Sequence, residues 1–136
     1  MDLKNLTTKQ EGATLELRHP ATGEILKYGG KKDQDHTMHL ILAGVDSDAY
    51  KKAQRKVTDR RFKQQQKFRQ VRLTSAMIED EAIEILTAVT LGGKLFMGGK
   101  ETAVDANNAG DIYREYPWIK EQADTFIEDR SNFLSS

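Results

Sequence analysis

Residues 116–134 constrain the fold most, because they combine a helix start with a one-sided apolar pattern that has to be covered. Pro117 suits the first position of a helix, where its missing N–H costs no hydrogen bond. At about 100° per residue, the apolar side chains of this segment fall within an arc of roughly 100°. These side chains are Ile119, Ala123, Phe126, Ile127 and Leu134. The sequence therefore predicts an amphipathic helix that begins at Pro117 and docks on another surface.

The N-terminal third has the pattern of antiparallel strands. Residues 13–18 alternate between apolar and polar with a period of two, and Pro20 and Gly23 are placed for a turn before the apolar return at 24–28. We expect a β-hairpin from these two segments. Residues 29–35 form a polar loop in this prediction, and residues 37–43 supply a third strand, because an isolated hairpin is only marginally stable.

The middle of the chain favours two helices. The first is expected over 46–71, with Asp46 or Ser47 as its N-cap. Its apolar face is interrupted by Arg61 and Gln64, and Phe62 points away from that face, so we expect its middle to stand clear of the core.

The second helix begins at Thr74 or Ser75 and carries the best candidate for a core stripe. That stripe consists of Ile78, Ala82, Ile85, Leu86 and Val89. Residues 92–100 are expected to form a short hairpin or an irregular loop, and a short helix is expected over 106–113.

These elements predict a single α+β domain over residues 1–136. A small N-terminal antiparallel hairpin or sheet occupies about 13–44, and a mainly helical part occupies about 46–134. The chain has no cysteine, so it can form neither a disulfide nor a thiolate metal site. It also lacks a long apolar run, so we expect a soluble, intracellular protein that does not contact membranes.

The net charge of zero conceals a strong segregation of charge. Residues 51–72 contain ten basic side chains and a single acid, Asp59, whereas the rest of the chain contains eleven basic and twenty acidic residues. A molecule with this polarity can associate head to tail with itself. The basic helix, Lys51–Arg72, could instead neutralise phosphates, which makes a small nucleic-acid-binding protein the alternative function.

Catalytic and cofactor signatures are missing from the sequence. A P-loop requires Lys followed by Ser or Thr, but Lys100 is followed by Glu101. His36 and His39 could meet a metal on a helix, but in a strand a spacing of three places their rings on opposite faces. The acids of 79–84 suit the solvated face of a helix. We therefore expect no enzyme activity, no catalytic residues, no bound metal and no cofactor.

The ending Tyr116-Pro117-Trp118-Ile119, followed by Glu121-Gln122, Asp124, Phe126-Ile127, Asp129-Arg130 and Asn132-Phe133-Leu134, resembles the C-terminus of the tail assembly chaperones of long-tailed bacteriophages. The order of 20–23, 42–50 and a long Arg/Lys/Gln helix matches one branch of this family, so the resemblance covers most of the chain.

The resemblance implies a non-catalytic protein that binds the tape-measure protein and keeps it soluble until the tail tube polymerises. It further implies contact with the tail-tube protein, self-association, and a location in the host bacterial cytoplasm rather than in the mature virion. The candidate partner-binding residues are Arg61, Phe62, Trp118, Ile119, Phe126, Ile127 and Phe133.

Overall fold

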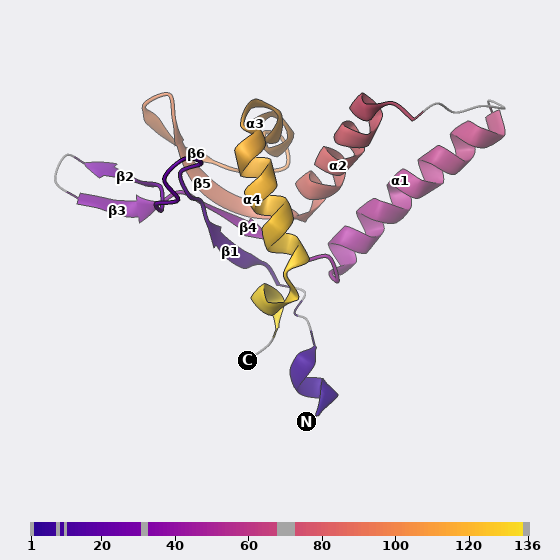
Figure 1. Ribbon diagram of the computed structural model, residues 1–136, viewed down its shortest axis with the longest axis horizontal. Coiled ribbons are helices and arrows are strands. Elements are labelled where there is room, and N and C mark those ends of the chain that lie inside the picture. Colours follow the sequence, from indigo (N-terminus) through magenta and orange to yellow (C-terminus); the bar gives the residue numbers. More distant parts are fainter. Residues whose placement is uncertain (1, 8, 10, 31–32, 68–72, 135–136) are drawn as a thin grey trace.

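A four-stranded antiparallel sheet packs against helices in this protein, and a pair of helices extends away from it (Figure 1). The computed structural model describes residues 2–7, 9, 11–30, 33–67 and 73–134. The spatial order of the strands is β1 (Ala13–Glu16), β4 (His39–Leu42), β5 (Thr90–Met97) and β6 (Lys100–Ala103). The expected α+β class is confirmed.

Strand β1 pairs with β4, so the expected hairpin of 13–18 with 24–28 forms only near its turn. An isolated bridge joins Arg18 to Ile25 and the Leu26 N–H donates to Leu17, but before Leu17 the first segment pairs with β4 and after Leu26 the second pairs with β3. Where the two segments part, a ring of three backbone hydrogen bonds of 2.8–2.9 Å joins them to the residue before β4: Leu17 donates to Met38, Met38 to Leu26 and Leu26 to Leu17. Because an alternating pattern specifies a buried face but not a neighbour, it could not distinguish these two pairings.

The polar loop expected over 29–35 is wrong for residues 29–30 and 33–35, which belong to a second sheet, and residues 31–32 lie outside the described residues. Strand β2 (Lys27–Gly30) pairs with β3 (Asp33–Thr37), and this ribbon projects on the opposite side of the molecule from the helix pair (Figure 1). Tyr28 is 7% exposed because its ring stacks on Phe96 of β5, with the ring centroids 5.4 Å apart. Burial of this ring favours the ribbon over a solvated loop.

The glycine-rich segment after α2 forms a hairpin, one of its two predicted alternatives. Strand β5 lies in the middle of the sheet, between β4 and β6. Gly98 and Gly99 have φ angles of +56° and +79°, as the two central residues of a tight hairpin turn require. Gly93 has a φ of +140° within β5, where a Cβ atom would lie only 2.3 Å from the carbonyl oxygen of His39.

The longer helices begin at the residues that the sequence indicates. Helix α1 spans Asp48–Lys67, and α2 spans Ser75–Val89 with Thr74 as its N-cap, whose hydroxyl accepts a hydrogen bond from the Met77 N–H. The last residues of the expected first helix, 68–71, lie outside the described residues. The remaining helices are α3 (Ala109–Glu115), α4 (Pro117–Glu128) and the short 3₁₀ helices η1 (Leu3–Leu6) and η2 (Arg130–Phe133).

The core stripe predicted for α2 is partly wrong. Leu86 and Val89 are buried as expected, but Ile83 is buried as well and Ile78 is 52% exposed. The reason is that α2 is covered from more than one side, by α1 and by α3, α4 and β5. Ile78 lies at the free end of the helix pair, where no core remains to cover it.

The C-terminal helix begins at Pro117 as predicted but ends at Glu128. Asp129 leaves the helix, and its carboxylate accepts a hydrogen bond from the Ser131 N–H, which starts η2. This break turns Phe133 back onto Gly44, where a Cβ atom would lie 2.8 Å from the Phe133 ring. Phe133 is therefore buried in place of Leu134, which is 36% exposed.

One core joins the sheet to α2, α3 and α4. Its only described hydrogen bond between two buried side chains links Thr90 to Tyr113, with the two oxygens 2.7 Å apart, and the Thr90 hydroxyl also lies 2.7 Å from the Leu86 carbonyl. Burial raises the pKa of Tyr113 to about 12. The phenol therefore keeps its proton in the folded protein well above the pH at which an exposed tyrosine loses it.

Gly93→Ala should destabilise the fold by more than about 2 kcal/mol, because it combines a left-handed φ with a backbone clash. Gly92→Ala is the matched control, since its Cβ would meet only the Ile41 side chain at 3.8 Å. For this control we expect a change of less than about 1 kcal/mol. Urea unfolding of both variants checks the prediction, and equal losses at the two positions would contradict it.

Tyr113→Phe should reduce the alkaline sensitivity of the fold. The folded-state pKa of Tyr113 is raised from 10.0 to about 12, so its contribution to stability is complete below pH 10 and is lost as the pH rises toward 12. Free energies of unfolding measured from pH 8 to pH 11 should fall more steeply for the natural protein than for the variant. At pH 8 the variant should lose about 1 kcal/mol for the missing hydrogen bond.

Candidate functional site

Three of the seven candidate partner-binding residues lie in the protein's own core. Ile119, Ile127 and Phe133 are 3%, 4% and 2% exposed. Ile119 and Ile127 hold α4 against the sheet, and Phe133 packs edge-on against Phe126, with the ring centroids 5.5 Å apart. In this conformation their side chains support the fold and are not presented to a partner.

Trp118 and Phe126 are half-buried, with part of each ring accessible. Trp118 contacts Tyr116 edge-on, with the ring centroids 6.2 Å apart, and borders a small apolar cavity of about 170 Å³ between α4 and the sheet. Phe126 lines a larger groove on the other side of α4. The C-terminal helix thus offers aromatic edges to a partner, while its apolar centre is already covered.

Arg61 and Phe62 lie on α1 but face different surroundings. Arg61 points to α2, where its Nε lies 2.7 Å from the Glu81 carboxylate. Phe62 is 60% exposed and lies roughly opposite Ala53 and Val57, the buried residues of α1. Arg61 therefore belongs to the contact between α1 and α2, and Phe62 belongs to the free surface of α1.

The basic helix is only partly neutralised by its neighbour. Arg60 donates two hydrogen bonds, of 2.7 and 2.8 Å, to Glu84 of α2, and these bonds lower the pKa of that carboxyl group. Together with the pair of Arg61 and Glu81, this contact joins α1 to α2. The other cations of the described helix lie on its exposed sides: Lys51, Lys52, Arg55, Lys56, Lys63 and Lys67.

Three large apolar side chains are exposed on the part of the helix pair that is farther from the sheet. Phe62 lies near the end of α1, Leu73 directly precedes the N-cap of α2, and Ile78 lies in the first turn of α2. They are 60%, 50% and 52% exposed. This part of the helix pair extends away from the sheet, so the three side chains are available to a second molecule (Figure 1).

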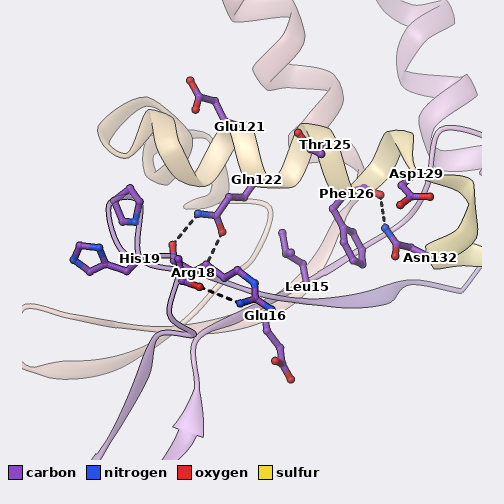
Figure 2. A pocket seen from close by; sticks show the side chains of 12 residues that line it. Leu15, Glu16, Arg18, His19, Glu121, Gln122, Thr125, Phe126, Asp129 and Asn132 are labelled. Atoms are coloured by element: carbon purple, nitrogen blue, oxygen red, sulfur yellow. Dashed lines mark hydrogen bonds between the residues drawn. The ribbon is translucent and has the colours of Figure 1, made fainter.

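A groove runs between β1 and α4, and we call it the β1–α4 groove (Figure 2). Its volume is about 540 Å³. Leu15 and Phe126 point toward each other across it, and at one end the Gln122 side chain forms two hydrogen bonds with the backbone of Arg18. The residues that line it are Leu15, Glu16, Arg18, His19, Pro20, Gly23, Glu121, Gln122, Thr125, Phe126, Asp129 and Asn132.

Only Phe126 in this groove was among the sequence candidates. The remaining lining residues come from β1 with the turn after it and from α4 with the residues after it, about a hundred positions apart, as the contact of Arg18 with Gln122 illustrates. Local sequence patterns carry no signal for such a pairing, because Gln122 looks like any exposed helical glutamine.

The outer face of the sheet carries a polar hollow of about 490 Å³ under the β2–β3 ribbon, which we call the outer-sheet hollow. His36 and His39 both line it, so the expectation that their rings lie on opposite faces is wrong. The strand is interrupted at Met38, where β3 ends and β4 begins, and this break resets the alternation. Among the described residues, no group of three or more metal-binding side chains is arranged to hold an ion.

An ion pair crosses this hollow. The Nζ of Lys94 lies 3.1 Å from the Oε1 of Glu101, and the hydrogen bond from Lys94 lowers the pKa of the Glu101 carboxyl group. Burial, followed by the hydrogen bond to Glu101, raises the pKa of the Tyr28 phenol. Tyr28 and Glu101 therefore hold the ribbon on the sheet through polar as well as stacking contacts. The expected absence of catalysis stays a prediction.

Comparison with known proteins returned no match: no protein-family model matches the sequence, and neither a curated protein nor a solved structure is significantly similar to it. Within the described residues, the structure contains no helix long and apolar enough to cross a lipid bilayer.

Proposed function

We propose that this protein is a tail assembly chaperone of a long-tailed bacteriophage. In this proposal it binds the tape-measure protein in the host bacterial cytoplasm, keeps it soluble until the tail tube polymerises, and is absent from the mature virion. The observation that carries the proposal is the free end of the helix pair, with Phe62, Leu73 and Ile78 exposed beyond the protein's own core. The resemblance of residues 116–134 to the chaperone family supplies the identity of the client.

The exposed end of the helix pair suits a helical client. An amphipathic helix presents apolar side chains at i, i+3, i+4 and i+7, which can pack on exposed apolar side chains such as Phe62 of α1 or Ile78 of α2. A tape-measure protein of this kind would otherwise expose the same side chains to its own copies. Binding needs no covalent chemistry, and the chaperone leaves when tail-tube subunits compete for the client with higher affinity.

The cations of α1 would set the orientation of the client. Lys52, Lys56 and Lys63 are exposed along one side of the helix, about one or two turns apart. An acidic flank on the client helix would be drawn to this side, which adds specificity more than affinity. The same charges could also attract the acidic body of a second copy, and we include self-association in the proposal.

A nucleic-acid-binding protein is the second candidate, and the exposed cations of α1 favour it. Two observations weigh against this alternative. Arg60 and Arg61 are already paired with Glu84 and Glu81 of α2, so they are not free for phosphates. The rest of the chain carries twenty acidic residues, which would repel a nucleic acid backbone beyond α1.

Replacing Phe62 and Ile78 together by Ser should abolish binding of a tape-measure fragment while the protein remains folded, because both side chains are exposed. Co-expression with the fragment, followed by light scattering of the soluble fraction, measures the effect. The natural protein should keep the fragment soluble, and the double variant should leave it aggregated.

Leu3→Ser is the matched control, since Leu3 is 79% exposed on η1, outside the helix pair. This control should bind as the natural protein does. If the double variant solubilises the fragment as well as the natural protein does, the client does not bind at Phe62 and Ile78. Binding of duplex or single-stranded DNA that weakens strongly between about 50 and 200 mM salt, without any effect on the fragment, would favour the nucleic-acid alternative.

Self-association should weaken as salt is raised, because the attraction between α1 and an acidic surface is screened over about 8 Å at 0.15 M ionic strength. Sedimentation at about 50 and about 500 mM salt measures this effect. Replacement of Lys52, Lys56 and Lys63 by Gln should reproduce the high-salt result at low salt. An oligomer that is unchanged by salt and by these substitutions would show that charge does not hold it together.

A further inference from the structure

We propose that the free edge of β1 binds an extended peptide segment of another protein, which adds to the sheet as a fifth strand. The segment alternates apolar and basic side chains. This inference is independent of the client of the helix pair, because the β1 edge and the free end of α1 and α2 lie on different parts of the molecule (Figure 1).

The backbone of β1 provides the first argument. Strand β1 lies at the edge of its sheet, with β4 on one side. Leu17, which follows β1, donates a backbone hydrogen bond to Met38, which precedes β4. Because bonded residues alternate along an antiparallel pair, Leu15 and Ala13 are the residues of β1 that bond to β4. Thr14 and Glu16 consequently turn their N–H and C=O groups outward.

Those outward groups are open in the part of the chain that the structure describes. Apart from the pairing of β1 with β4, the backbone N–H and C=O groups of Thr14 and Glu16 form no backbone hydrogen bond there. A row of unpaired donors and acceptors at a sheet edge is a template for another strand. Two residues with both groups open can form four hydrogen bonds with an added strand.

Gln122 shows where such a strand would have to stop. The next outward-facing residue after Glu16 is Arg18, and the Gln122 side chain both accepts from its N–H and donates to its C=O, at 2.9 and 2.8 Å. The amide of Gln122 thus occupies the place of a neighbouring strand at Arg18 (Figure 2). The backbone groups of the edge are therefore hydrogen-bonded at Arg18 and unpaired at Thr14 and Glu16.

The two faces beside the edge give the added strand its side-chain preferences. On the helix side lies the β1–α4 groove, where Leu15 and Phe126 form an apolar floor. On the other side lies the outer-sheet hollow, lined near β1 by Thr14, Glu16 and His39. Because side chains of a strand alternate between faces, the peptide needs apolar residues toward Phe126 and polar residues toward Glu16.

Charge decides the sign of those polar residues. Within the described residues, the carboxylates of Glu16 and Glu121 form neither a hydrogen bond nor an ion pair, and the carboxylate of Asp129 bonds only to Ser131. The guanidinium of Arg18 donates to the neutral Gly23 carbonyl, 3.0 Å away, and keeps its positive charge, so three carboxylates and one cation line this edge. The surroundings of the edge are therefore acidic, and they favour Lys or Arg in the added strand.

A second copy of this protein fits the edge less well. Its own β1 would bring Thr14 and Glu16 to the same edge, and the only charge that it could offer is another carboxylate. Like charges close together across two strands are unfavourable. The occupant is therefore a different chain with basic side chains at alternate positions.

A peptide of about six residues that alternates Lys and Val, blocked at both ends, is the probe for this site. Fluorescence anisotropy should show binding to the full-length protein. Amide hydrogen exchange should slow at Thr14 and Glu16 when the peptide is added. A peptide that alternates Glu and Val should bind at least about tenfold more weakly, because it meets the same carboxylates with the wrong sign.

Thr14→Pro removes the N–H that the peptide needs, and Thr14→Ala retains it. The proline variant should bind at least about tenfold more weakly than the alanine variant. If the proline variant fails to fold, the same peptide N-methylated at its lysines as well as its valines tests the backbone bonds on the natural protein and should lose binding. Unchanged binding of the N-methylated peptide would overturn the proposal, and so would a natural-protein dimer that Thr14→Pro dissociates.

Discussion

The burial of one face of the four-stranded sheet is the constraint on which the rest of the structure depends. Leu40, Leu42 and Leu95 on this face, with Leu17 beside them, are each at most 2% exposed, and they pack with the apolar sides of α2, α3 and α4 into one core. A protein of this size gains most of its stability from such a contact. Because the C-terminal helix is part of that core, its apolar residues support the fold first and can serve a partner only at their edges.

This core leaves two parts of the molecule outside it, and both have features of binding surfaces. The helix pair is held together by the buried Ala53 and Val57 of α1 and by the ion pairs of Arg60 with Glu84 and Arg61 with Glu81, which are individually weak at a solvated surface. Its free end exposes apolar side chains, and α1 exposes cations. At the other side, the edge of β1 offers open backbone groups between an apolar groove and a polar hollow. A basic, helical surface and an acidic strand edge would select different partners.

Helix starts were predicted better than strand partners, for a physical reason. Thr74 and Pro117 act through groups within four residues of themselves, by capping an N–H and by lacking one, so their effect is readable locally. The pairing of β1 with β4 involves residues about 25 positions apart, and the alternation of 13–18 is equally compatible with the wrong neighbour. The prediction of where α4 ends was wrong for a related reason, because Phe133 is buried through its contact with Gly44 in a distant loop.

The sequence by itself determined the α+β class, the start of α2 and α4, and the separation of a basic helix from an acidic remainder, since these follow from local propensity and composition. Only the tertiary structure decided the neighbours of each strand, the position of β5 in the middle of the sheet, and the contact of Gln122 with Arg18. It also decided that Ile119, Ile127 and Phe133 are core residues. An amphipathic pattern states that a face is buried, but the covering surface is fixed by contacts between segments far apart in the chain.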